Sequence, residues 1–566
     1  MALLLAWRVR FVQDDAFIAF LYARNWVQGH GLTWFGARVE GYSDFLWVVW
    51  IGLGLRCGAN PIVWSYVGGL AAFAVTLHAT WRLATALCGR SVAALAVMLL
   101  LATNASTLYF ATGGLETMLQ AAWTSQAALQ LLRLRSAVAR RRASANLSAA
   151  TRDEMRHALA LGAFCGGALL TRLDSALPVA VLGASALLAL LPPGPSAVAV
   201  RRESRRVLLA LALPVLLLMV PWLAWKLAYY GSVLPNTYAA KVAWSGAMAA
   251  AGLLYLWRFV NAYLLWPFLA VAAIGSIVHR VRGNAPPPPV AGPLARSGEL
   301  PPGVIPAMWK TLGLVLLVWY AYLVVIGGDF MEFRLCVPVM PFLFLVLTGG
   351  LAAAPPRRLV LPSLAVLVLV LGLSSLLHAR RFRGVTPDYR LDSVPTLATF
   401  YDVYPDRDFS TIGSELGRQL AGTDAQIALH AVGAIPYYSG LRTVDMFGLN
   451  DRQIARTGHR APPRFRRPGH QRQVTLADLR QRGVHLIIGH PTLVPPGAFA
   501  DPRISVYGQW VRDILGYSRE PLGRVQLVGM PLPRGDLLMW YLTPSPAIDA
   551  VIREHGWGTA TIQVRR

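Results

Sequence analysis

Apolar residues dominate the chain in long runs separated by short polar breaks. After Tyr42 these runs are about 20 residues long, enough for an α-helix to cross the ~30 Å hydrocarbon layer of a bilayer. The pattern predicts spanning helices at residues 62–88, 91–110, 113–133, 157–172, 175–193, 207–230, 261–279, 308–326, 334–352 and 358–377. The sequence therefore predicts a polytopic α-helical membrane protein.

The two ends of the chain depart from this pattern. Residues 1–7 precede Arg8 and are too few to cross a bilayer, so we expect a truncated first spanning helix that would bring the predicted total from ten to eleven. Segment 43–56 is short and rich in Trp, which favours an interfacial helix over a span. After residue 377 the chain becomes polar with strand-like runs such as 484–488, which predicts an α/β domain over 378–566.

Arginine placement predicts the orientation. Segment 133–157 holds seven arginines and segment 201–206 holds four, and a Pro-rich stretch at 283–309 is flanked by basic residues. These connections satisfy the positive-inside rule if they are cytoplasmic. The first outer loop, 13–61, and the tail, 378–566, then face the extracytoplasmic side. We expect a multi-pass membrane protein with these two segments outside the cytoplasm.

Composition excludes several classes of protein. The 566 residues are 55% hydrophobic and only 14% charged, whereas a soluble domain is about 45–50% apolar and about 25% charged. The net charge of +25 would suit a nucleic-acid-binding protein, but it is concentrated in short loops between spans, so no nucleic acid is expected as a partner. The four cysteines show no metal-like spacing, and neither a disulfide framework nor a zinc site is predicted: Cys57, Cys88, Cys165 and Cys336.

Acidic residues between spans fall mainly on the predicted outer side. Charged groups are costly at membrane depth and normally face an internal cavity. Carboxylates at helix ends on one face are therefore suited to a membrane-embedded active site. The outer set is Asp14, Asp15, Glu40, Asp44, Glu116, Asp174, Asp329 and Glu332.

The adjacent Asp14 and Asp15 form the strongest candidate for chemistry. They open an amphipathic helix, where the helix dipole favours an acidic residue and one of them can serve simply as the N-cap. Two neighbouring carboxylates raise the pKa of one member, which suits a general base. We expect Asp14 or Asp15 to be catalytic, with helix capping as the alternative.

Sequence motifs along most of the chain resemble the GT-C fold glycosyltransferases. The group that they resemble most is that of lipid-linked-sugar transferases of the terminal arabinofuranosyltransferase (AftB) type. The motifs are Asp14-Asp15-Ala-Phe-Ile, Tyr22-Ala-Arg-Asn25, Gly29-His30-Gly31-Leu32, Val39-Glu40-Gly41-Tyr42-Ser43, Gly114-Leu115-Glu116-Thr117, Thr171-Arg172-Leu173-Asp174, Leu234-Pro235-Asn236-Thr237-Tyr238 with Lys241, Gly327-Gly328-Asp329-Phe330-Met331 with Arg334 and Pro338, and the tail blocks 433–440 and 445–451.

This resemblance implies a GT-C-like transmembrane catalytic domain over 1–377 that takes a sugar from a polyprenyl phosphate in the outer leaflet. It also implies a bacterial inner (plasma) membrane, with the active site on the periplasmic side. The acceptor would be an extracytoplasmic glycan or glycoconjugate, and arabinofuranose would be the donor sugar. No cofactor is expected beyond the lipid donor, and the sequence leaves divalent-metal dependence open. The implied substrate-binding residues are His30, Glu40, Tyr42, Glu116, Arg172, Asp174, Asn236, Tyr238, Lys241, Asp329 and Arg334.

Alternatives to these roles stay open at the level of sequence. The lipid phosphate needs a cation, and Arg172, Lys241 and Arg334 lie at outer helix ends, where they can also be snorkelling interfacial residues. Glu116 can stabilise a helix start, and Asp174 can simply pair with Arg172. A lipid-linked glycan flippase or a non-catalytic glycan-binding subunit are the alternative functions. Transporters place polar groups near the bilayer midplane, whereas here the carboxylates gather at one face.

Overall fold

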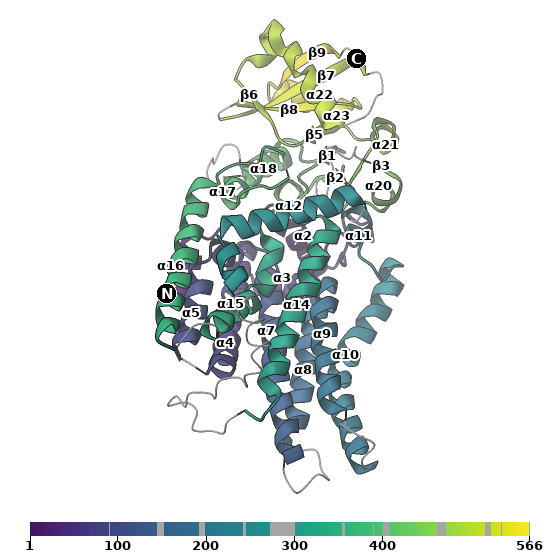
Figure 1. Cartoon of the computed structure of the whole chain (residues 1–566). Helices are drawn as coiled ribbons and strands as arrows, with labels where there is room; N and C mark the ends of the chain where they lie inside the picture. The colour runs from purple at the N-terminus through teal and green to yellow at the C-terminus, as the bar shows by residue number, and fades with distance from the viewer. Residues whose placement is uncertain are drawn as a thin grey trace.

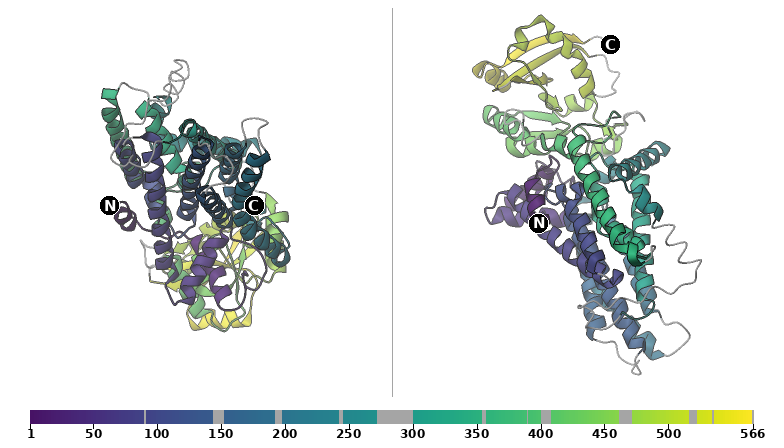
Figure 2. Two further views of the ribbon diagram at one scale, coloured as in Figure 1. Left: turned by 90° about the horizontal axis from the view of Figure 1, so that it is seen from below. Right: turned by 60° about the vertical axis from the view of Figure 1, so that its left-hand side comes forward.

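A helical bundle carries a mixed α/β layer at one end (Figure 1). The computed structural model describes residues 1–89, 91–143, 152–191, 198–241, 245–271, 300–353, 357–388, 390–399, 408–460, 471–515, 522–533 and 535–564. The right-hand view of Figure 2 also shows that the strands lie together beyond one end of the bundle.

Among the described residues up to 381, the regular secondary structure is helical. The helices are α1 (Ala2–Arg8), α2 (Ala16–Val27), α3 (Phe45–Arg56), α4 (Pro61–Cys88), α5 (Ser91–Thr103), α6 (Ala105–Tyr109), α7 (Thr117–Ala143), α8 (Arg152–Thr171), η1 (Leu173–Ser175), α9 (Ala176–Leu190), α10 (Val198–Tyr230), α11 (Asn236–Lys241), α12 (Gly246–Ala262), α14 (Val304–Ile326), η2 (Arg334–Val339), α15 (Met340–Ala353) and α16 (Arg357–Arg381).

Within the described residues, six helical segments are long and apolar enough to cross a membrane. They are Pro61–Cys88, Leu173–Leu190, Glu203–Tyr230, Val304–Ile326, Arg334–Ala353 and Arg358–Arg381. Helices α7 and α8 match two further predicted spans but are less apolar, because they carry the arginines of the connection between them. The prediction of a polytopic helical membrane protein is confirmed.

Local sequence explains where the predicted spans begin, break and end. Asn60 accepts hydrogen bonds from the N–H groups of Ile62 and Val63 and so begins α4. The predicted span 91–110 is interrupted at Asn104, whose side chain accepts from the N–H of Thr107 and starts the separate helix α6. A single unbroken helix over 91–110 is therefore wrong, because Asn104 offers the backbone a competing hydrogen bond.

The predicted start of another span, 261–279, is wrong. Helix α12 ends at Ala262, and the chain turns through Leu264, which has a positive φ of 49°. In Figure 1, α12 runs across the ends of the bundle helices instead of along them. The remainder of this prediction, 272–279, lies outside the described residues.

The tail forms the expected α/β structure. Its helices and strands are α17 (Val394–Thr399), α18 (Phe409–Gln419), β1 (Gln426–Leu429), α19 (Ala434–Ser439), β2 (Arg442–Asp445), α20 (Arg452–Thr457), β3 (His459–Arg460), β4 (Arg472–Gln473), α21 (Leu476–Gln481), β5 (Leu486–Gly489), β6 (Leu493–Val494), η4 (Ala498–Ala500), η5 (Pro502–Tyr507), α22 (Gly508–Ile514), β7 (Gly523–Leu532), β8 (Gly535–Tyr541), α23 (Pro546–Glu554) and β9 (Gly558–Val564).

The main sheet of the tail has seven strands in the order β2-β1-β5-β8-β7-β9, with β6 paired to β8. Strand β1 lies parallel to β2 and β5, whereas the pairs that involve β8 and β9 are antiparallel. Short runs of buried residues form β1 and β5, as expected for strands that are covered on both faces. The division of the chain at residues 377 and 378 stays a prediction.

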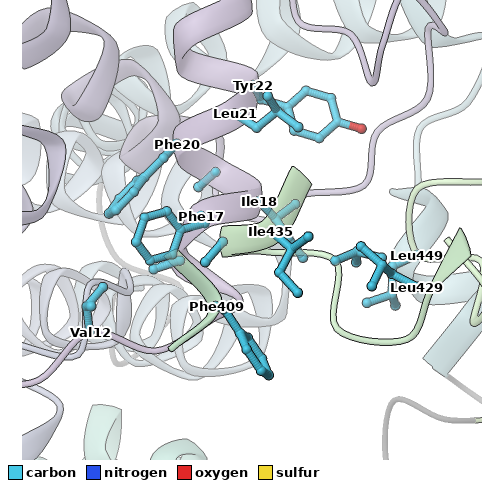
Figure 3. Packing of buried hydrophobic residues seen from close by; sticks show 14 of the residues in the cluster. Val12, Phe17, Ile18, Phe20, Leu21, Tyr22, Phe409, Leu429, Ile435 and Leu449 are labelled. Atoms are coloured by element: carbon cyan, nitrogen blue, oxygen red, sulfur yellow. The ribbon is translucent and has the colours of Figure 1, made fainter. Parts of the chain in front are cut away.

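Helix α2 joins the tail to the bundle through one hydrophobic core. Phe17, Ile18 and Phe20 of α2 are buried in the same cluster as Phe409 and Ile435 of the tail. Figure 3 shows these side chains in one region, with Ile18 of α2 beside Ile435 of the tail. The first loop therefore lies between the bundle and the tail, which places its polar residues at the junction.

Candidate active site

The two aspartates before α2 have different surroundings. The carboxylate of Asp14 is buried and accepts backbone hydrogen bonds from Gly433 at 3.1 Å and Ala434 at 2.7 Å. Burial raises the pKa of Asp14 to about 7, although these two N–H groups oppose the rise. Asp15 is half-buried and interacts electrostatically with Arg334. Asp14 thus holds the tail, and Asp15 belongs to a neighbouring charged cluster.

That charged cluster brings together the ends of several helices. Arg172 pairs with Glu116 at 2.5 Å and with Asp174 at 2.7 Å, and all three side chains are largely buried. Gln120 of α7 donates a 2.9 Å hydrogen bond to Asp174. The structure therefore contains the Arg172–Asp174 ion pair that the sequence offered as an alternative to substrate binding. Glu116 is a second carboxylate partner of the same arginine.

A second ion pair, Arg334 with Asp329 at 2.7 Å, lies close to the first. Asp329 follows two glycines with positive φ, 88° at Gly327 and 77° at Gly328, a backbone conformation that glycine adopts readily. Arg334 interacts electrostatically with Glu116 and Arg172, so the two ion pairs belong to one cluster.

Asp44 was not among the residues expected to bind substrate, but it lies in the same cluster. It interacts electrostatically with Glu116 and Arg172. Burial raises the pKa of Asp44, and the Glu116 carboxylate adds to the rise. Burial would also raise the pKa of Glu116, but Arg172 and Arg334 outweigh that effect and lower it. The cluster therefore keeps a proton on Asp44 more readily than on Glu116.

The cluster carries more acidic than basic groups. Two guanidinium groups face five carboxyl groups, so both arginines are already occupied by protein carboxylates. An additional anion, such as a lipid phosphate, would be repelled by the surplus of negative charge. We name these seven residues the outer charged cluster: Asp15, Asp44, Glu116, Arg172, Asp174, Asp329 and Arg334.

A cavity of about 180 Å³ lies at the end of α10, between α11 and α20. Tyr238, which lines the cavity, interacts electrostatically with Tyr322 of α14. Tyr322 also interacts electrostatically with Arg172. The cavity is thus a neighbour of the outer charged cluster. Its polar lining consists of Glu40, Tyr230, Ser232, Asn236, Tyr238, Arg452 and Arg456.

Positive charge prevails in the cavity. Glu40 is buried and forms a 2.9 Å ion pair with Lys226, which is itself buried inside α10. Burial raises the pKa of Glu40 to about 7 against the opposing effect of Lys226. Arg452 donates a short hydrogen bond to the carbonyl of Tyr230. Arg456 is exposed and pairs with no carboxylate among the described residues.

The remaining predicted site residues have varied positions. The amide of Asn236 donates to the carbonyls of Gly448 and Leu449 and so attaches α11 to the tail. Tyr42 is buried, and its hydroxyl lies 3.2 Å from that of Tyr230. His30 is exposed, and among the described residues its imidazole has no hydrogen-bond partner. The structure does not bring His30 into the outer charged cluster.

Several residues of the site were missed in the sequence or lie beyond the described part of the chain. The side chain of Lys241 lies outside the described residues, although its backbone ends α11. Lys226 was missed, yet a lysine within an apolar run is a signal for a functional or paired group. Arg452 and Arg456 gave no such signal, because arginine is common throughout the chain.

A metal site in the part of the chain that the structure describes would need several His, Cys, Asp or Glu side chains close together. No group of three His, Cys, Asp or Glu side chains in this part of the chain has a geometry that could hold a metal ion. The carboxylates of the outer charged cluster instead have arginine partners.

Comparisons with known proteins agree with the fold. Residues 403–524 match a family described as Domain of unknown function (DUF8728). The sequence matches none of the curated proteins. Among solved structures, ArnT from Cupriavidus metallidurans in the apo state is similar at 15% identity and a TM-score of 0.52, over 96% of this chain and 97% of that one.

Two further structures match less well. The first is the same ArnT bound to undecaprenyl phosphate, at 14% identity and a TM-score of 0.49 over 78% of this chain and 84% of that one. The second is the oligosaccharyltransferase AglB from Archaeoglobus fulgidus with an inhibitory peptide and a dolichol-phosphate, at 10% identity and a TM-score of 0.46 over 94% of this chain and 72% of that one.

The fold defines the class of the protein: it is a polytopic membrane protein with the GT-C fold of membrane glycosyltransferases and a C-terminal α/β layer. Within that class it is similar in fold to ArnT along nearly its whole length. At this level of identity the likeness concerns the fold, and the chemistry must be argued from the site.

Proposed function

We propose that this protein is a glycosyltransferase that moves a sugar from a polyprenyl-phosphate donor to an extracytoplasmic glycan or glycoconjugate. The observation that carries the proposal is the position of a half-buried aspartate, Asp15, in the outer charged cluster beside a cationic cavity. A carboxylate base and a separate anion-binding cavity are the two components that such a transfer needs.

Asp15 is the proposed base. It accepts the proton of the acceptor hydroxyl while the acceptor oxygen bonds to the anomeric carbon and the bond from that carbon to the phosphate oxygen breaks. Polyprenyl phosphate leaves with the bonding electrons and one more negative charge. Asp14 is less suited to this step, because Gly433 and Ala434 already occupy its carboxylate oxygens.

The cavity is the proposed position of the donor phosphate. Arg452 and Arg456 supply positive charge to the cavity. The negative charge of Glu40 is balanced by its ion pair with Lys226. Lys241 follows the cavity residues of α11 in the sequence and is proposed as a further cation. Leu234, on the cavity rim, is 50% exposed and is proposed to face the lipid at the membrane surface. The outer charged cluster, with its surplus of carboxylates, suits the acceptor and the proton instead.

The identity of the sugar is the finer part of the proposal. Arabinofuranose follows from the sequence resemblance alone, and none of the residues described above distinguishes a furanose from a pyranose. The assay below therefore uses several donors. A flippase is less well supported, because the outer charged cluster and the cavity lie at helix ends, and among the described residues no comparable cluster lies along the middle of the membrane-crossing segments.

The experiment is a transfer assay on the full chain in liposomes. Wild-type protein is given polyprenyl-phosphate arabinofuranose, mannose or 4-amino-arabinose with a short glycan acceptor. We expect turnover with one donor, and a loss of about 10²–10⁴-fold in the Asp15→Asn variant. Asp513→Asn, an exposed aspartate of the tail, is the matched control and should retain full activity. Movement of the donor across the bilayer without any transfer would contradict the proposal in favour of a flippase.

A further inference from the structure

A second cationic group lies at the opposite end of the bundle from the tail. Arg133 of α7 interacts electrostatically with Arg82 of α4 and Arg156 of α8. A contact of 2.9 Å between Nδ1 of His157 and Oε1 of Gln130 joins α8 to α7 at this level. Arg156 precedes His157, and Arg133 follows Gln130 by about one helical turn. Three neighbouring helices therefore bring their arginines to one place.

Three other arginines at this end of the bundle have protein partners. Arg141 pairs with Glu154 at 2.8 Å, Arg206 pairs with Glu203 at 2.7 Å, and Arg135 donates to the carbonyl and hydroxyl of Ser185. By contrast, the side chains of Arg82, Arg133 and Arg156 form no ion pair or hydrogen bond with any described residue. A carboxylate is nevertheless present nearby, that of the exposed Asp153.

The arrangement is unfavourable without an anion. Arg133 is half-buried, so its guanidinium has lost part of its hydration and repels the other two. Guanidinium groups bind phosphate through two parallel hydrogen bonds, and the two non-bridging oxygens of a phosphate diester can accept from more than one guanidinium. The chemistry of the site thus fits a phosphate ligand.

The surroundings of the three arginines indicate which kind of phosphate compound would bind there. Figure 1 shows that α7 and α8 extend further from the tail than α4 does. Leu159, which follows Arg156 by about one helical turn on α8, is 41% exposed. Helix α5, which packs against α4, carries Leu95, which is 52% exposed. Exposed apolar surface next to a phosphate site matches the acyl chains and headgroup of a phospholipid.

We propose that Arg82, Arg133 and Arg156 bind the headgroup phosphate of an anionic phospholipid in the leaflet remote from the tail. This site is independent of the proposed transferase activity. A lipid bound there bridges α4, α7 and α8 and stabilises the part of the bundle that carries Glu116 at the other end of α7.

The test uses the full chain in a neutral detergent. Phosphatidylglycerol is titrated in while native mass spectrometry counts bound lipid and thermal unfolding reports Tm. We expect phosphatidylglycerol to bind and to raise Tm, phosphatidylcholine to bind at least tenfold more weakly, and 10 mM inorganic phosphate to leave Tm unchanged. Equal effects of the two lipids, or a rise in Tm with inorganic phosphate, would overturn the proposal.

Variants locate the effect. Arg133→Gln with Arg156→Gln should lower the affinity for phosphatidylglycerol at least tenfold, whereas Arg205→Gln, an exposed arginine of α10, should leave it unchanged. Arg82→Gln serves as a second variant because this side chain is exposed and its removal leaves no cavity. If the double variant and Arg82→Gln both bind phosphatidylglycerol as the wild type does, the assignment is wrong.

Discussion

The carboxylate of Asp14 accepts a 2.7 Å hydrogen bond from the backbone N–H of Ala434, which lies 420 residues later in the sequence. The same carboxylate also accepts a hydrogen bond from the backbone N–H of Gly433, so a residue of the first loop binds the start of α19. A tail helix is thereby held against the segment that carries Asp15. The geometry of the proposed base thus depends on the docking of the tail.

Asp14 should make the stability of the protein depend on pH. Its pKa is about 7 in the folded protein and near 4 in the unfolded chain, so the folded state binds the additional proton between these values. The stability that this proton contributes is present at low pH and is lost as the pH rises through about 7. We expect Tm of the wild type to fall between pH 5 and pH 8.

Asp14→Asn isolates this contribution, because other buried carboxyl groups titrate in both proteins. The variant should have a lower Tm at pH 5, since Asn does not offer two acceptor oxygens, and a smaller fall in Tm toward pH 8. The measurement is thermal unfolding in detergent at several pH values. Parallel Tm profiles of the variant and the wild type would show that Asp14 does not carry the proton.

The contact between the first loop and the tail predicts a steric effect at Gly41. A Cβ atom there would lie 1.7 Å from Oδ1 of Asn450, and the hydroxyl of Tyr22, which accepts a hydrogen bond from the N–H of Gly41, is also close. Gly41→Ala should therefore cost about 1–3 kcal/mol, as expected for overpacking, and lower transfer activity by displacing Glu40.

Gly183→Ala is the control for Gly41→Ala. Gly183 lies inside α9, and no atom would come within 4 Å of a Cβ added there. Alanine has the higher helix propensity, so this variant should be as stable as the wild type or slightly more stable. Thermal unfolding of both variants checks the prediction, which fails if the two shift Tm equally.

The cavity predicts a specific effect of Arg456. Removing one charged partner of a phosphate should cost about 1.5–3 kcal/mol of binding, or roughly 10- to 150-fold in affinity. Arg456→Gln should therefore raise KM for the lipid donor by that factor, with a much smaller change in kcat. Steady-state kinetics with varied donor concentration measure both constants.

Arg503→Gln is the matched control, because Arg503 is an exposed arginine of the tail that pairs with Asp501. It should leave KM unchanged. An equal rise in KM for both variants would indicate a general effect of the charge of the tail, and an unchanged KM in Arg456→Gln would place the phosphate elsewhere.

Arg172 should be intolerant of neutral replacement. Arg172→Gln would leave Glu116 and Asp174 buried without their cation, and breaking a buried ion pair costs about 3–5 kcal/mol. Arg172→Lys keeps the charge but cannot donate to both carboxylates with the same fork geometry, so it should restore only part of the stability. Tm of the two variants, measured beside Arg418→Gln as an exposed control, tests the order.

Much of the fold could be predicted because membrane helices depend on local composition. The apolar run that became α4 ends in the structure at Cys88, and β5 begins within the predicted strand at 484–488. The prediction failed where one polar residue redirected the chain, as Asn104 did between α5 and α6. A single polar residue hardly alters the average hydrophobicity of an apolar run, but its side chain can form a hydrogen bond with the backbone that ends a helix.

The sequence by itself determined the class of protein, the helical bundle and the restriction of carboxylates to certain helix ends, because hydrophobic length and charge are local properties. Only the tertiary structure decided which charges meet. It separated Asp14, which binds the tail, from Asp15, and it joined Glu40 to Lys226. These pairings depend on side chains brought together from distant segments by packing, and periodicity along the chain carries no information about them.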